Sequence, residues 1–281
     1  MIYVSTGGIS NQSGLESAIG FYELGLNAIE LSGGRYSDAQ LKLLSPLKEL
    51  ITFRIHNYFP PPKDPFILNL ASTNDHIVKR SFELIESSLV YCEELNCSKY
   101  SFHAGFLLDP KLSDLGNDIK SRSILPKEKA LDLFLERVNM ISKKAREHGV
   151  DLMIENNVLT KSNLNHFNQN PFLMVDTEDC IYVMKNTPDN VNLLIDLGHL
   201  NVSSKSLKFD SINFLKNCSN WVKGYHFSDN DGVKDQNYPI NFDSWFWNYI
   251  DKNIEYNSLE IYNTTLSTLI DQINITKKIL N

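Results

Sequence analysis

Short apolar stretches alternate with longer amphipathic ones along the whole chain, and this alternation constrains the fold more than any other feature. Eight apolar stretches have the length and composition of β-strands, and they are residues 2–5, 27–32, 51–56, 99–103, 151–155, 191–196, 224–227 and 258–261. The stretches predicted to be helical are residues 13–24, 37–50, 74–94, 126–148, 177–185, 209–217, 243–251 and 265–280. A polar, Asn-rich loop is expected to follow the fifth strand and to reach residue 171.

Strands that alternate with helices form parallel β-α-β units. Eight such units in 281 residues predict an α/β fold, a (β/α)8 TIM barrel that occupies residues 1–281 as a single domain. The alternative is an open, doubly wound sheet, which usually has a Gly-rich phosphate loop after its first strand. The Thr6-Gly7-Gly8-Ile9 segment at that position matches such a loop poorly, so the closed barrel is the prediction.

Composition and charge argue against several classes of partner. The formal net charge of −7 argues against a broad nucleic-acid interface and against binding to an anionic membrane surface. No apolar run has membrane-spanning length, and no secretory signal precedes the first strand, so we expect a cytoplasmic protein. The four cysteines form no CxxC pair and are predicted to be reduced thiols.

Polar side chains occupy the carboxyl ends of most predicted strands, which is the end of a TIM barrel where active sites lie. These residues are Glu30, His56, His103, Glu155, Asp196, His226 and Glu260. The alternation within a strand directs them into the barrel: Leu152 and Ile154 face the helices, so Glu155 faces inward. Carboxylates that crowd together raise each other's pKa, and a divalent cation relieves their repulsion. The sequence therefore predicts a metal site at the barrel mouth.

Several short motifs occur in a fixed order along most of the chain. They are Arg54-Ile55-His56-Asn57-Tyr58-Phe59, Ile67-Leu68-Asn69-Leu70-Ala71-Ser72, Ser101-Phe102-His103-Ala104-Gly105, Ile154-Glu155-Asn156, Asp196-Leu197-Gly198-His199, His226-Phe227-Ser228-Asp229 and Leu259-Glu260. The ordered set resembles the xylose-isomerase-like TIM-barrel superfamily, which includes sugar phosphate isomerases and epimerases and endonuclease IV. The resemblance is specific to the superfamily but not to one substrate.

The resemblance implies ligands for two metal positions. The first position is held by a quartet that the epimerases share with endonuclease IV, and the matching residues here are Glu155, Asp196, His226 and Glu260. The second position, which binds a further metal in endonuclease IV together with the bridging glutamate, matches His56 and His103. The expected cofactor is a divalent ion, either Mn²⁺, Mg²⁺, Co²⁺ or Zn²⁺, and no nucleotide cofactor is expected.

One departure from the endonuclease IV pattern concerns a third metal. His199 matches a histidine that contacts substrate in the epimerases and a third metal in endonuclease IV. The other ligands of that metal form an Asp-x-His motif, and the corresponding stretch here is Asp235-Gln236-Asn237. Because an Asn amide is a poor ligand for zinc, we assign His199 to substrate binding. Further predicted substrate contacts are Arg54, Tyr58 and Asp229, with an ion pair to Glu30 as the alternative role of Arg54.

The first functional hypothesis is a sugar or sugar-phosphate isomerase or epimerase. Such an enzyme removes a proton from the carbon beside a carbonyl, and the resulting enediolate needs positive charge near its oxygens. By resemblance to the epimerases, Glu155 and Glu260 would act as acid and base on opposite faces of the substrate. The expected partner is a small sugar or sugar phosphate, with neither nucleic acid nor membrane, and the aromatic helices outside the barrel are compatible with a homodimer.

The alternative hypothesis is an endonuclease IV-like phosphodiesterase that acts at abasic DNA. His56, His103 and Tyr58 favour it, because paired metals generate a hydroxide and stabilise a leaving oxygen. The acidic net charge, Asn237 and the scarcity of basic residues in the strand-end loops oppose it. A third hypothesis is a barrel that binds a polyol or sugar acid without turnover, or a dehydratase, and the presence of both glutamates disfavours an inactive protein.

Overall fold

In the computed structural model, which describes residues 1–9, 11–114, 117–120 and 122–280, eight parallel strands form a closed barrel. The strands follow one another in chain order, and the last closes the barrel by pairing with the first. They are β1 (Ile2–Ser5), β2 (Ala28–Leu31), β3 (Thr52–His56), β4 (Lys99–His103), β5 (Asp151–Glu155), β6 (Val191–Asp196), β7 (Val222–Phe227) and β8 (Tyr256–Leu259). The predicted (β/α)8 TIM barrel is therefore confirmed.

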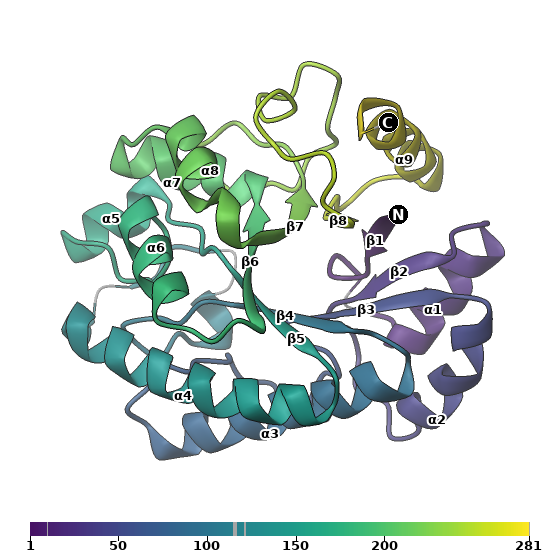
Figure 1. Ribbon diagram of the computed structural model, residues 1–281, viewed down its shortest axis with the longest axis horizontal. Coiled ribbons are helices and arrows are strands. Elements are labelled where there is room, and N and C mark those ends of the chain that lie inside the picture. The colour runs from purple at the N-terminus through teal and green to yellow at the C-terminus, as the bar shows by residue number, and fades with distance from the viewer. Residues whose placement is uncertain (10, 115–116, 121, 281) are drawn as a thin grey trace.

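Helices surround the barrel on its outside (Figure 1). They are α1 (Gly14–Glu23), α2 (Gln40–Leu44), α3 (Asp75–Glu94), α4 (Lys127–Glu147), α5 (Lys161–Phe167), α6 (Thr177–Lys185), α7 (Leu197–Leu207), α8 (Ser211–Cys218) and α9 (Leu266–Leu280). Short 3₁₀ helices lie at Ser45–Glu49, Leu112–Asp114 and Ser219–Trp221. Within the described residues, no helix is long and apolar enough to cross a membrane.

The helices begin where side chains can satisfy their free backbone N–H groups. The Ser13 hydroxyl accepts a hydrogen bond from the Glu16 N–H, and the Glu16 carboxylate accepts one from the Ser13 N–H at 2.6 Å. This reciprocal pair is a capping box and fixes the start of α1. Single side-chain oxygens, without the reciprocal bond of a capping box, accept hydrogen bonds from N–H groups at the starts of α3, α5, α6 and α8, and they belong to Asn74, Thr160, Asp176 and Asp210.

Two helices lie where the sequence predicted none. The loop expected to reach residue 171 contains α5, which Thr160 caps. The second is α7, which begins directly after β6 because the Asp196 carboxylate accepts a hydrogen bond from the His199 N–H at 2.6 Å. This cap turns the chain outward at the end of β6 and places His199 in the first turn of a helix.

The predicted helix at residues 243–251 is wrong. The segment consists of successive turns in which N–H groups bond to carbonyls three residues back, as from Trp247 to Ser244 and from Tyr249 to Phe246. Side chains hold these turns in place, since the Trp247 indole N–H donates to the Asn241 carbonyl at 2.7 Å. The predicted helix at residues 37–50 is interrupted, because Pro46 lacks an N–H and the chain changes from α2 to a 3₁₀ helix there.

The barrel interior has an apolar layer just below its polar mouth. Met153, Leu194 and Tyr256 form this layer, separately from the larger core between strands and helices. Gly224 of β7 faces them, and a Cβ atom there would lie 2.4 Å from a Tyr256 ring carbon and 2.8 Å from a Leu194 methyl. Only glycine therefore fits at this point of β7 without displacing its neighbours.

We expect the Gly224→Ala substitution to lower the free energy of unfolding by about 1–3 kcal/mol, because an added methyl overpacks the barrel interior. Gly20→Ala in α1 is the matched control, since nothing lies within 4 Å of the added methyl, and it should raise that free energy by up to about 1 kcal/mol. Urea denaturation of both variants checks the prediction. Equal changes in the two variants would contradict tight packing around Gly224.

Candidate metal centre

The residues predicted at the strand ends lie together at the carboxyl-end mouth of the barrel. The strand register brings them into contact, because His103 pairs with Glu155 across β4 and β5, and Asp196 pairs with His226 across β6 and β7. Glu260 lies one residue beyond β8, where its N–H donates to the Phe227 carbonyl at 3.1 Å. All of them are buried except His103, whose side chain is 28% exposed.

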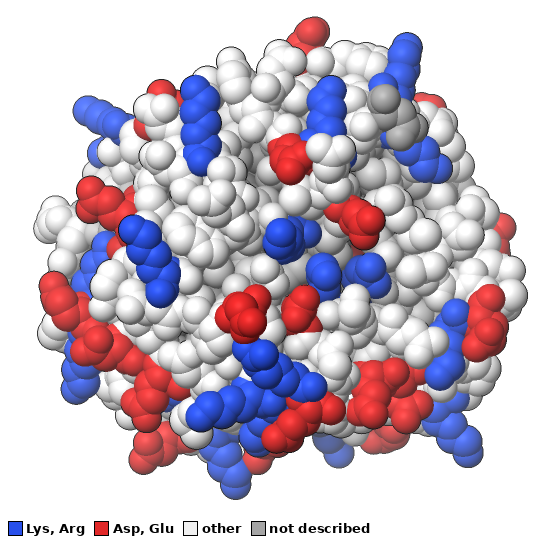
Figure 2. Space-filling model, viewed as in Figure 1, with Lys and Arg blue, Asp and Glu red and all other residues white. Residues whose placement is uncertain are grey.

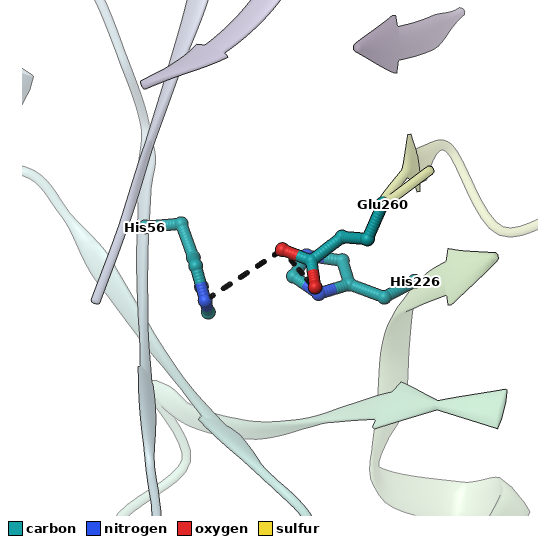
Figure 3. Close-up of side chains that lie close together, drawn as sticks. All are labelled: His56, His226 and Glu260. Atoms are coloured by element: carbon teal, nitrogen blue, oxygen red, sulfur yellow. Dashed lines mark ion pairs between the residues drawn. The ribbon is translucent and has the colours of Figure 1, made fainter. Parts of the chain in front are cut away.

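Four of these side chains form a compact group: Glu155, Asp196, His226 and Glu260. One potential ligand atom from each lies within 4.8 Å of the corresponding atoms of the other three. His226 Nδ1 is 3.5 Å from Glu155 Oε1, 3.5 Å from Glu260 Oε1 and 4.0 Å from Asp196 Oδ2. Figure 3 shows Glu260 beside His226, with His56 reaching towards Glu260 from the other side.

The atoms that face the centre of this group have no hydrogen-bond partners. They are Oε1 of Glu155, Oδ2 of Asp196 and Nδ1 of His226, and each is buried. An unpaired buried polar atom costs free energy, and a buried charge costs more unless an opposite charge meets it. A divalent cation would satisfy all of these atoms at once, and carboxylate with imidazole is a ligand set that such ions take. The quartet therefore fits a divalent metal.

A second group shares Glu155 with the first. His56, His103 and Glu155 also place one ligand atom each within 4.8 Å of the others. Glu155 Oε2 lies 3.4 Å from His56 Nε2 and 3.6 Å from His103 Nδ1, whereas its Oε1 faces His226. A carboxylate with one oxygen towards each group has the geometry of a bridging ligand, so the two groups are adjacent candidate metal positions.

The role of Glu30 is not apparent from the sequence. Its Oε2 atom accepts a hydrogen bond from His226 Nε2 at 3.2 Å, which leaves His226 Nδ1 free for the centre. Burial opposes the charge of Glu30, but His226 outweighs burial and holds the pKa of the Glu30 carboxyl at about 2. A carboxylate behind a ligating histidine fixes the orientation of the ring and raises its basicity. The only sequence signal for this role is that Glu30 lies near the carboxyl end of β2, with its side chain on the inward-facing side of that strand.

The two glutamates of the quartet ionise differently. Burial raises the pKa of the Glu260 carboxyl to about 8. Burial also raises the pKa of the Glu155 carboxyl, but the surrounding imidazoles outweigh it and hold that pKa well below its usual value. His103 has the largest influence among these imidazoles. Two carboxyl groups whose surroundings push their pKa values apart are suited to act as an acid and a base.

His199 lies at the edge of the centre, on the first turn of α7. Its Nδ1 is 2.9 Å from the Asn156 carbonyl oxygen, and its Nε2 is 3.3 Å from Asp235 Oδ2. Asp235 corresponds to the aspartate of the Asp-x-His motif of endonuclease IV, and it does lie beside His199. Asn237 occupies the position of the histidine in that motif. Its backbone carbonyl accepts a hydrogen bond from the Tyr262 N–H at 3.1 Å.

The other predicted substrate contacts have partners of their own within the protein. The guanidinium of Arg54 lies over the Tyr3 ring at 4.8 Å and donates to the Phe53 carbonyl. The Tyr58 hydroxyl accepts a hydrogen bond from the Phe66 N–H at 2.6 Å. The Asp229 carboxylate accepts hydrogen bonds from the Ser244 hydroxyl at 2.8 Å and from the Asn230 N–H at 2.9 Å. Substrate contact by Arg54, Tyr58 and Asp229 stays a prediction.

The fold and the site define a TIM-barrel protein with a candidate metal centre at the carboxyl ends of its strands. A family model described as the xylose isomerase-like TIM barrel matches residues 22–262, so the chain belongs to this family. A sequence comparison with curated proteins gave no significant match.

Solved structures with the same fold include sugar epimerases and an endonuclease. A D-tagatose 3-epimerase-like protein is 20% identical with a TM-score of 0.73, over 99% of this chain and 96% of its own. D-psicose 3-epimerase with D-tagatose from Clostridium cellulolyticum H10 is 12% identical with a TM-score of 0.69, over 100% and 99%. An AP endonuclease, family 2, from Brucella melitensis is 14% identical with a TM-score of 0.64, over 95% of both chains. At these identities the likeness shows the fold alone.

Proposed function

We propose that the protein is a metal-dependent isomerase or epimerase that acts on a small sugar or sugar phosphate. The observation that supports the proposal is the pair of buried glutamates, Glu155 and Glu260, which each place an oxygen 3.5 Å from His226 Nδ1 and differ in their tendency to ionise. The same residues complete a ligand group that fits a divalent ion. Fold neighbours named as sugar epimerases support the proposal.

The reaction proposed is proton transfer at the carbon beside a carbonyl. A divalent metal held by the quartet would supply positive charge at the carbonyl and hydroxyl oxygens of the sugar, which stabilises an enediolate. The ionised Glu155 takes the proton from carbon, and the electron pair of the C–H bond moves towards the carbonyl oxygen. Glu260, the more basic of the two glutamates, binds a proton again in the substrate complex and returns it to carbon from the other face. His199 would contact a substrate oxygen in competition with Asp235, whose Oδ2 lies 3.3 Å from His199 Nε2.

Metal binding is expected to release protons at pH 7. In the metal-free protein Glu260 is mostly protonated at this pH, since its pKa is about 8, whereas a ligating carboxylate must be ionised. Glu260 gives up this proton to solvent as the pH rises through about 8, so affinity for the metal should increase with pH over this range. Titration calorimetry in buffers of different ionisation enthalpy measures the released protons. A binding enthalpy that does not depend on the buffer would contradict the prediction.

A phosphodiesterase of the endonuclease IV type is the second candidate, and the group of His56, His103 and Glu155 favours it. Two adjacent metal positions are suited to activate water and to stabilise a leaving oxygen. The net charge of −7 weighs against a DNA substrate. On the face shown in Figure 2, basic and acidic side chains are also interspersed and form no continuous basic area. Incubation with a duplex that contains an abasic site tests this candidate directly.

We also propose that the protein works in the cytoplasm. All four cysteines are free and buried in the structure, which fits a reducing compartment. A homodimer is proposed only from exposed aromatic side chains on the outer helices, such as Tyr22 and Tyr182. Analytical ultracentrifugation tests the dimer.

A further inference from the structure

A continuous chain of hydrogen bonds runs beneath the candidate metal centre and connects two of its three candidate histidine ligands, His226 and His56. It starts at His226 Nε2, which lies 3.2 Å from Glu30 Oε2. The Tyr256 hydroxyl donates to the same carboxylate oxygen. The Tyr256 oxygen is 3.1 Å from Ser101 Oγ, and Ser101 Oγ is 2.9 Å from His56 Nδ1. Every member is buried, and the chain draws on five different strands.

The number of protons along the chain fixes the direction of every hydrogen bond. An ionised carboxylate only accepts hydrogen bonds, so both His226 Nε2 and the Tyr256 hydroxyl donate to Glu30. Tyr256 has then used its one proton, so Ser101 must donate to the Tyr256 oxygen. Ser101 has likewise used its proton, and its oxygen accepts from His56 Nδ1.

The consequence concerns the nitrogen that each histidine offers to a metal. Glu30 holds the Nε2 proton of His226, so Nδ1 is the nitrogen left for a metal, and it lies 3.5 Å from one oxygen each of Glu155 and Glu260. His56 carries its proton on Nδ1, so the lone pair of Nε2 points towards Glu155 Oε2 at 3.4 Å. The Glu30 carboxylate thus sets the tautomers of both His226 and His56, although the hydroxyl groups of Tyr256 and Ser101 lie between it and His56.

We propose that Glu30 is a positioning residue for both metal positions, and that Tyr256 and Ser101 carry its influence to His56. This inference rests on the proposed metal site but not on the proposed sugar chemistry. The two metal positions can be tested separately, because Tyr256 connects Glu30 to the His56 side of the chain, whereas Glu30 contacts His226 directly. Outer partners of ligating histidines typically change metal affinity about 10–100-fold when they are removed.

The test measures Zn²⁺ binding at each position in three variants. Tyr256→Phe is expected to weaken the second position about 10–100-fold while the quartet position keeps its affinity. Glu30→Gln is expected to weaken both, because an amide can donate to His226 Nε2 and favour the wrong tautomer. Tyr3→Phe is the matched control: the Tyr3 ring lies 6.1 Å from that of Tyr256, but its hydroxyl is not part of the chain.

A second readout needs neither metal nor substrate. Long-range ¹H–¹⁵N spectra of the metal-free protein report which nitrogen of His56 carries the proton. We expect the proton on Nδ1 in the unaltered protein and in Tyr3→Phe, and a shift of population towards Nε2 in Tyr256→Phe, where Ser101 is free to donate to His56. If Glu30→Gln does not fold, Tyr256→Phe decides alone.

The outcomes distinguish this inference from the proposed function. An unchanged His56 tautomer and unchanged zinc affinities in Tyr256→Phe would overturn the inference, whether or not the protein transfers protons in sugars. The expected tautomers and selective zinc loss, in a protein that exchanges no sugar proton, would support the inference and refute the proposed function.

Discussion

Replacing Glu260 with glutamine is expected to slow proton transfer at the sugar carbon by about 10²–10⁴-fold, which is the usual contribution of a general acid or base. Glutamine keeps the size and the hydrogen-bonding oxygen of the side chain, but it has no ionisable proton to return to the substrate. The Ser5 hydroxyl, 3.4 Å from Glu260 Oε1, retains an acceptor, so the local structure should survive. The rate of exchange in deuterated water, followed by NMR, measures the effect.

The matched control for this variant is Glu147→Gln, which makes the same chemical change on an exposed side chain at the end of α4. It should leave the exchange rate unchanged. A Glu260→Gln protein that binds metal normally and exchanges at the unaltered rate would show that Glu260 is a ligand at most, and not the acid.

Removal of the metal is expected to have the second large effect, this time on stability. A ligand that binds only the folded protein stabilises it by about 4 kcal/mol at a thousand times its Kd. The quartet meets this condition because its ligands come from the ends of four separate strands and are dispersed in the unfolded chain. Adding Mn²⁺ or Zn²⁺ to metal-free protein should therefore raise Tm by several degrees, and a chelator should reverse the change.

Asp196→Asn is the informative variant for this effect. Asparagine is as good a helix cap as aspartate, so the hydrogen bond to the His199 N–H and the start of α7 should be kept. The charge that faces the metal is lost, so the rise in Tm should shrink or vanish. A full rise in Tm in Asp196→Asn would place the metal elsewhere. Glu147→Gln again serves as the control and should behave like the unaltered protein.

The barrel and most candidate ligands could be predicted because their signals are local. Alternation within a strand fixes which way Glu155 points, and the strand end is marked by the change from apolar to polar residues. The contacts between ligands then follow from strand register, as for Asp196 and His226. No such local signal exists for contacts that cross the barrel interior.

The partner of Glu30 shows this limit. Glu30 and Arg54 are register neighbours on β2 and β3, so an ion pair between them was a natural alternative. Instead, Arg54 lies over the Tyr3 ring, and Glu30 reaches across the interior to His226 and Tyr256. These partners are far away in the sequence, and only closure of the barrel brings them together.

The errors in helix prediction have a related cause. The sequence of α7 contains a glycine, an asparagine and three serines, which are weak helix formers. The helix forms because the Asp196 carboxylate caps it and its residues are buried against the barrel. At residues 243–251 the aromatic spacing suits a helix, but side-chain hydrogen bonds from Ser244 to Asp229 and from Trp247 to the Asn241 carbonyl hold separate turns instead.

The central claim is that Glu155 and Glu260 move a proton at the carbon beside a sugar carbonyl, and deuterium exchange tests it most directly. Metal-loaded protein would be incubated in deuterated water with ketoses, aldoses and their phosphates, and carbon-bound deuterium followed by NMR. We expect deuterium at the carbon beside the carbonyl of at least one sugar, with loss of that signal in Glu260→Gln. Nicking of abasic duplex DNA with no carbon-bound deuterium in any sugar would contradict it.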